Sequence, residues 1–65
     1  MPDTFDRELI RLLRQAGCRL VRPGKGSHQI WYSPITERHF PVPIGIKSRH
    51  TANGILRQAG IDARL

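Results

Sequence analysis

The pentapeptide Leu-Arg-Gln-Ala-Gly occurs twice in this chain of 65 residues, at positions 13–17 and 56–60. Each copy ends with a glycine directly after an apolar pattern of helical spacing, where a residue without a Cβ can adopt the left-handed conformation that ends a helix. The next residue is apolar in both copies (Cys18 and Ile61), so it can pack back onto the last helical turn. The surrounding sequences do not match. We therefore interpret the repeat as two helix ends rather than as a duplicated unit.

The first helix is predicted over residues 4–16, because five apolar residues there share one face at the 3.6-residue period of a helix. They are Phe5, Leu9, Leu12, Leu13 and Ala16. We expect Asp3 or Thr4 to cap its start by accepting free backbone N–H groups. Asp6 lies near the same end, where the helix dipole favours a negative charge.

The second helix is predicted from about Ser48 or Thr51 to Ala59. Its apolar positions again follow helical spacing: Ala52, Ile55, Leu56 and Ala59. A glycine inside a helix costs about 1 kcal/mol relative to alanine. We therefore expect the backbone at Gly54 to approach a neighbouring segment closely.

Three segments between the helices have the composition of strands: 18–22, 27–32 and 38–42. Residues 23–26 and 34–37 have the composition of turns, and such short connections favour an antiparallel meander. A proline in the third strand places that strand at an edge of the sheet. We therefore expect an α+β fold of order α-β-β-β-α, formed by residues 1–65 as one domain. Both helices would cover one face of the three-stranded sheet and leave the other face open.

The two faces of the sheet can be assigned from the alternation of side chains along a strand. Packing the bulkiest apolar side chains toward the helices places Trp31, Phe40 and Val42 in the core. The residues that then face outward are His28, Tyr32 and His39. A shift of one residue in the register would reverse this assignment.

Lys and Arg outnumber Asp and Glu by 11 to 5, which gives a net charge of +6 and a pI near 11.2. The excess lies in residues 18–50, which hold six Lys and Arg residues against Glu37 alone. This asymmetry favours a polyanion as the partner. The chain is too short for a cofactor-binding α/β fold and has no apolar run that could span a membrane. With one cysteine, we expect a reduced, cytoplasmic protein without disulfides.

His28 is the best candidate for a catalytic residue. It follows the glycine-containing turn Lys25-Gly26-Ser27 at the start of a strand, and imidazole can transfer protons near neutral pH. Gly26 would allow backbone N–H groups to approach a phosphate, with Lys25 beside them. The alternative is a tight turn without function. The segment is not a P-loop, because the upstream glycine is missing and a strand follows.

Other residues are candidates for binding RNA. Tyr32 on the open face could stack on an unpaired base, although a purely structural role is as plausible from sequence. Lys47 and Arg49 precede or begin the second helix, where free N–H groups already favour an anion. The alternative is that they are simply solvated. The three histidines and the cysteine follow no compact ligand spacing, so we expect no metal site and no cofactor.

Five features of the chain resemble, in order and spacing, the HicA family of toxin–antitoxin ribonucleases. They are a first helix ending in Ala-Gly, a basic strand, Gly26-Ser27-His28 opening the next strand, Val42-Pro43, and a closing helix that ends in residues 55–60. The resemblance implies a fold like that of double-stranded-RNA-binding domains. It also implies metal-independent cleavage of mRNA, with His28 as the catalytic residue, and a HicB-type antitoxin that blocks the toxin. Many members carry a further histidine where this chain has Ile44, so His28 is more isolated here.

RNA can be cleaved without a metal because its own 2′-OH can displace the neighbouring 5′-oxygen. His28 would act as base or acid, Lys25 would stabilise the phosphate, and His39 is a candidate for the second proton transfer. This mechanism expects the imidazole to project from the uncovered sheet into a cationic hollow. One alternative to the nuclease is a non-catalytic RNA-binding module of the same fold. The other alternative is an interaction domain whose basic face docks an acidic protein.

Overall fold

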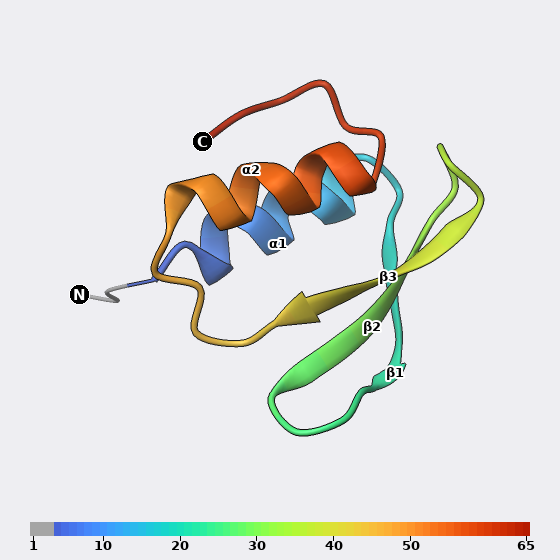
Figure 1. Cartoon of the computed structure of the whole chain (residues 1–65). Coiled ribbons are helices and arrows are strands. Elements are labelled where there is room, and N and C mark those ends of the chain that lie inside the picture. The colour runs from blue at the N-terminus through green and yellow to red at the C-terminus, as the bar shows by residue number, and fades with distance from the viewer. Residues whose placement is uncertain (1–3) are drawn as a thin grey trace.

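A computed structural model describes residues 4–65, and its element order confirms the predicted α-β-β-β-α arrangement (Figure 1). The elements are α1 (Asp6–Gln15), β1 (Arg19–Pro23), β2 (His28–Ser33), β3 (Arg38–Pro43) and α2 (Arg49–Gln58). The three strands form an antiparallel sheet in the order β1-β2-β3, so β2 is central and the proline-containing β3 is an edge strand. Both helices lie on the same side of the sheet (Figure 1). None of the helices within residues 4–65 is long and apolar enough to cross a membrane.

The core lies between the helices and the sheet, as the alternation of side chains predicts. Trp31, Phe40 and Val42 are buried, and Trp31 retains only 1% of its exposure. The helices contribute further buried side chains: Leu9, Leu13, Ala52, Ile55 and Leu56. Leu12 is only partly buried against this core. The opposite face of the sheet carries basic and polar residues together with Ile30 and two prolines, Pro41 and Pro43.

The two copies of the pentapeptide end α1 and α2 with the same geometry. Gly17 and Gly60 have φ angles of +92° and +77°, in the left-handed region that glycine adopts without strain. The N–H of the following residue then bonds back to the last turn, from Cys18 to the Leu13 oxygen and from Ile61 to the Leu56 oxygen, each at 2.9 Å. The interpretation of the repeat as two helix ends is confirmed.

The start of α1 differs from the prediction. The N-cap position is Phe5, which makes no side-chain capping bond, so capping by Thr4 is wrong, and Asp3 lies outside the described residues. The carboxylate of Asp6 instead accepts backbone N–H groups from Gly45 at 2.8 Å and Ile46 at 2.7 Å. The Phe5 N–H also donates to the Ile46 oxygen, at 2.8 Å. These bonds fix the β3–α2 loop to the beginning of α1.

We expect Asp6→Ala to lower the free energy of unfolding by about 1–2 kcal/mol. Bonds to a charged acceptor contribute more than neutral ones, and the partial exposure of this carboxylate reduces the gain. Glu8→Ala is the matched control, because Glu8 is an exposed carboxylate in the same helical turn. Urea unfolding measures both variants. Equal small losses would mean that the Asp6 bonds do not stabilise the loop.

The prediction for α2 is partly confirmed. Ser48 is the N-cap, and its hydroxyl accepts the Thr51 N–H at 3.3 Å. The expected close approach at Gly54 is wrong, since a Cβ built on this residue would have no heavy atom within 4 Å. The exposed Gly54 therefore lowers helix propensity without a packing reason visible in the structure.

Candidate nucleic-acid interface

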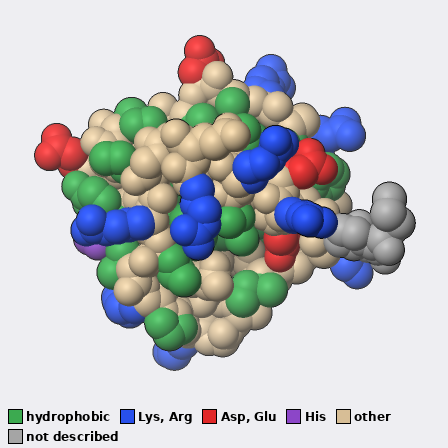
Figure 2. Space-filling model, turned by 180° about the vertical axis from the view of Figure 1, so that it is seen from behind, with side chains coloured by type: hydrophobic (Ala, Val, Ile, Leu, Met, Phe, Trp, Pro, Cys, Tyr) green, Lys and Arg blue, Asp and Glu red, His purple; other side chains and the backbone are tan. Residues whose placement is uncertain are grey.

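The uncovered face of the sheet presents side chains in three cross-strand rows, because residues paired across strands share a face. The rows are Arg19–Tyr32–His39, Arg22–Ile30–Pro41 and His28–Pro43. The outward placement of His28, Tyr32 and His39 thus agrees with the pairing register. We call these residues the open face. Figure 2 shows the molecule from behind, where Lys and Arg side chains are spread among hydrophobic and acidic ones and almost no histidine is visible.

A bulge in β1 increases the positive charge of the open face. Arg19 pairs with Tyr32 and Arg22 pairs with Ile30, with the register shifting between Leu20 and Arg22. Residues three apart in a regular strand would lie on opposite faces. The extra residue at the bulge, Val21, brings both arginines to the same face.

His28 combines an exposed side chain with a well-anchored backbone. Its oxygen accepts the Gly24 N–H at 2.8 Å, and its N–H donates to the Lys25 oxygen at 3.2 Å. The preceding residue, Ser27, accepts the Ile44 N–H through its carbonyl at 2.8 Å, which ties the turn to the β3–α2 loop. The imidazole therefore projects into solvent from a fixed position, which suits a group that must meet a substrate in one geometry.

The turn before His28 has room for a ligand. Lys25, Gly26 and Ser27 are all exposed. Gly26 has a φ of +63°, and a Cβ built there would meet no atom within 4 Å. Arg22 adds a second cation, because it pairs with Ile30, two residues from His28 on the same face. Such diagonal neighbours lie about 7–8 Å apart. The backbone of His28 thus lies near one basic residue on the sheet, Arg22, and one in the turn, Lys25.

The histidines do not converge. His28 pairs with Pro43 and His39 with Tyr32, so the rows of the two histidines are separated by four residues along the backbone of β2, or about 13 Å. This spacing, together with the contact of the His39 ring with Tyr32, disfavours His39 as the second proton-transfer group at the phosphate that His28 serves. Within residues 4–65, no group of three or more His, Cys, Asp or Glu side chains could hold a metal ion.

Tyr32 is held between two neighbours on the open face. The Arg19 guanidinium carbon lies 5.2 Å from the centroid of the Tyr32 ring. The His39 ring lies 5.1 Å from it, centroid to centroid, with the two planes inclined by 62°. Tyr32 is half-buried, whereas Arg19 and His39 are exposed. Sequence reasoning did not single out Arg19, because its face depends on the bulge that follows it.

Lys47 and Arg49 are exposed at the beginning of α2, as expected. The Arg49 guanidinium lies over the Phe5 ring, 5.8 Å from its centroid. This intramolecular contact gives Arg49 a reason to be there without any anion. Lys47 is the stronger of these two candidates for contact with RNA.

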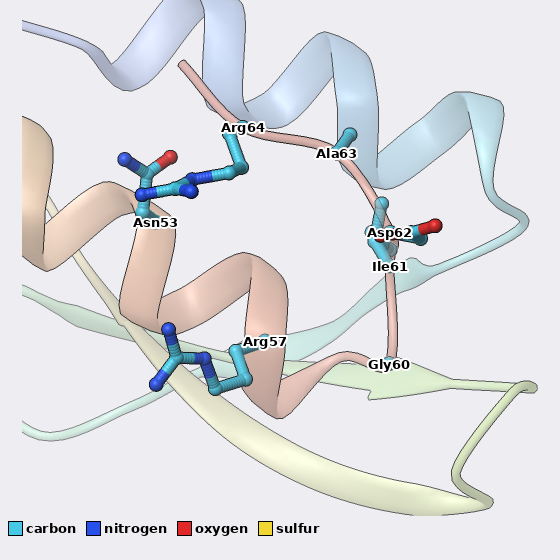
Figure 3. A pocket seen from close by; sticks show the side chains of 7 residues that line it. All are labelled: Asn53, Arg57, Gly60, Ile61, Asp62, Ala63 and Arg64. Carbon is cyan, nitrogen blue, oxygen red and sulfur yellow. The ribbon is translucent and has the colours of Figure 1, made fainter.

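The structure has two described cavities, and His28 lines neither of them, although Pro43, which pairs with His28 across the strands, lines the smaller one. The larger, about 360 Å³, is on the side of α2 that faces away from the sheet, under the C-terminal segment (Figure 3). Arg57 and Arg64 line this cavity. The side chain of Asn53 holds the C-terminal segment over it by accepting the Leu65 N–H at 2.7 Å. The smaller, about 160 Å³, is lined mainly by apolar residues of α1, β3 and the loop after β3. The side chain of His28 is exposed, and the cationic hollow expected around it stays a prediction.

Comparison with known proteins assigns the family. The family described as the HicA toxin of bacterial toxin–antitoxin systems matches residues 7–61, which include every strand and helix except the first residue of α1. Searches of curated proteins and of solved structures gave no significant match. The match covers most of the chain and agrees with the element order of the structure. The chain therefore belongs to the HicA family of toxins from bacterial toxin–antitoxin systems.

Proposed function

We propose that this toxin is an endoribonuclease that cleaves mRNA in the cytoplasm without a metal ion, with His28 as its catalytic residue. The observation that carries the proposal is the exposed imidazole on an anchored backbone at the uncovered face of the sheet, with Arg22 on the neighbouring strand and Lys25 in the preceding turn. Residues 1–65 would act as one HicA-like domain. Gly26, Ser27 and Lys47 would contact the sugar–phosphate chain around the scissile bond, and the more distant His39 would contact RNA farther along the strand.

The reaction uses the 2′-OH of the substrate as nucleophile. The 2′-oxygen forms a bond to the adjacent phosphorus as the bond from phosphorus to the 5′-oxygen breaks, which leaves a 2′,3′-cyclic phosphate and a free 5′-hydroxyl. One proton leaves the 2′-OH and one joins the departing oxygen. His28 transfers one of these protons, and the other exchanges with solvent. Arg22 and Lys25 stabilise the negative charge that develops on the phosphorane.

The proposal predicts that RNA cleavage persists in excess EDTA and that DNA of the same sequence stays intact. A single 2′-deoxy substitution at the scissile nucleotide should abolish the cut there, since it removes the nucleophile. Mass spectrometry of the products should find cyclic phosphate and 5′-hydroxyl ends. Products with 5′-phosphates, or loss of cleavage in EDTA, would contradict the mechanism.

The proposed partner is a HicB-type antitoxin that covers the basic open face. Binding to the folded state alone stabilises a protein by RT ln(1 + [L]/Kd), or about 1.4 kcal/mol at a free concentration ten times Kd. For a domain of this size, we expect Tm to rise by about 5–10 °C when the cognate antitoxin is added. A scan of the toxin with and without antitoxin measures the shift. An unchanged Tm would argue against direct binding.

A non-catalytic RNA-binding module of the same fold is the second candidate. The separation of His28 from His39 favours it, because no second histidine shares the His28 site within the described residues. Growth arrest on expression distinguishes the two functions. Arrest that His28→Ala relieves, without loss of RNA affinity, supports the nuclease. Arrest that is unchanged by this substitution supports the binding module.

A further inference from the structure

We propose that Arg19, Tyr32 and His39 form a stacking site for one unpaired RNA base, displaced along the sheet from the cleavage site at His28. The inference rests on the proposed function for its ligand, an RNA strand on the open face. It adds a specificity site to that function: the position of the cut would depend on the presence of a base at a fixed distance from the scissile phosphate.

The three residues form a row that crosses the whole sheet. Arg19 comes from β1, Tyr32 from β2 and His39 from β3, and the pairing register aligns them. The half-buried Tyr32 contacts both neighbours, with its ring centroid 5.2 Å from the Arg19 guanidinium carbon and 5.1 Å from the His39 ring. Tyr32 therefore restrains the orientation of two exposed planar groups. A ligand that stacks on them meets surfaces that are already ordered, which lowers the entropic cost of binding.

The chemistry of the row fits a base better than a phosphate. Unpaired bases stack on aromatic rings and on guanidinium planes, whichever base is present. A phosphate would need converging hydrogen-bond donors, which is the role proposed for the turn at residues 25–27. The bulge at Val21 supports this role, because it places Arg19 on the open face together with Arg22. Arg22 lies in the row next to that of His28, where the phosphate is expected.

The register fixes the distance between the two sites. Four residues of β2 separate the row of His28 from that of Tyr32, which corresponds to about 13 Å. A stacked nucleic-acid strand advances about 3.4 Å per nucleotide, and an extended one roughly twice as far. The stacked base should therefore lie about two to four nucleotides from the scissile phosphate, on one side of it.

The test uses DNA oligonucleotides that carry a single ribonucleotide, so that only one bond can be cleaved. An abasic nucleotide is placed in turn at each position up to five nucleotides on either side. We expect one abasic position, two to four nucleotides from the cut, to slow cleavage by roughly 5- to 150-fold, the loss of one base–aromatic stack. Equal rates at every position would overturn the proposal.

Variants of the row should remove this dependence on the abasic position. Two variants should cleave the intact and abasic oligonucleotides at similar rates: the double variant Arg19→Ala/His39→Ala and the single variant Tyr32→Leu. Tyr32→Phe should retain the dependence, because it keeps the ring that restrains both neighbours. Arg64→Ala removes an exposed arginine at the C-terminal segment and is the control for net charge. A dependence that survives in the double variant and in Tyr32→Leu would place the base elsewhere.

The design separates this inference from the proposed function. If wild-type protein cleaves every oligonucleotide equally, the nuclease stands and the stacking site fails. If nothing is cleaved, the nuclease fails, and fluorescence anisotropy with the same oligonucleotides decides the stacking site. One abasic position that weakens binding in the wild type, but not in the double variant, would support it. Uniform affinities would overturn it.

Discussion

Replacement of His28 by alanine is expected to slow RNA cleavage by about 10²–10⁴-fold, the usual contribution of one positioned proton-transfer group. The imidazole stands exposed at the start of β2, beside Lys25 and diagonally from Arg22. No other histidine lies in its row, so within the described residues none can substitute for it there. Single-turnover cleavage of an oligonucleotide with one ribonucleotide measures the effect without interference from product release.

The effect on stability and RNA affinity should be small. A substitution of an exposed side chain away from caps and buried bonds changes the free energy of unfolding by about 0.5 kcal/mol or less. His50→Ala is the matched control, since His50 is exposed in the first turn of α2 and lies outside the open face. It should cleave at the wild-type rate. A folded His28→Ala protein that also cleaves at this rate would remove His28 from the mechanism.

Gly60→Ala is expected to lower the free energy of unfolding by about 3 kcal/mol. The φ angle of Gly60 is +77°, a conformation that costs a residue with a Cβ about 1–2 kcal/mol. The added Cβ would also lie 2.8 Å from Ile35 Cγ2 and 2.9 Å from Thr36 Cγ2. Both are methyl groups on branched Cβ atoms in the β2–β3 turn, and relief of such overlap costs about 1–3 kcal/mol.

Gly54→Ala is the matched control, six residues earlier. Gly54 lies inside α2, and its new Cβ would meet no atom within 4 Å. The substitution should therefore stabilise the protein by about 0.5–1 kcal/mol through helix propensity. Urea unfolding of both variants gives the two values. Changes of the same sign would contradict the assignment of Gly60 as a helix end that requires glycine and of Gly54 as an unconstrained helical residue.

Local patterns in the sequence were sufficient for the element order and for the faces of the sheet. A glycine after an apolar helical stripe marks a helix end because few other residues adopt its conformation there, and both Gly17 and Gly60 do so. Alternation along a strand is equally local. It places Trp31 and Phe40 inward and His28 outward once the bulkiest residues are assigned to the core.

Features that depend on contacts between distant segments could not be predicted. Asp6 reads from sequence as a charge near a helix start, yet it binds the backbone of Gly45, 39 residues away. Ser33 is fully buried, and its hydroxyl is satisfied by donating to the Ala59 oxygen at 2.6 Å, a partner that no sequence pattern indicates.

The candidate site could also be predicted only in part, because its geometry depends on contacts between distant segments. The outward direction of His28 follows from alternation, but its distance from His39 depends on which residues pair across β2 and β3. The position of Arg19 depends on the bulge at Val21, since the residues of a regular strand would put Arg19 and Arg22 on opposite faces. Registers and bulges are set by the whole sheet, so these parts of the site appear only in three dimensions.

The measurement that tests the central claim most directly is an NMR titration of the toxin with an RNA oligonucleotide made uncleavable by 2′-deoxy substitution at the scissile nucleotide. The account predicts the largest backbone amide shifts at Arg19, Arg22, His28 and Tyr32, and small shifts at Asn53 and Arg57 on the outer side of α2. Large shifts confined to α2 and residues 61–65, with the open face unchanged, would contradict it.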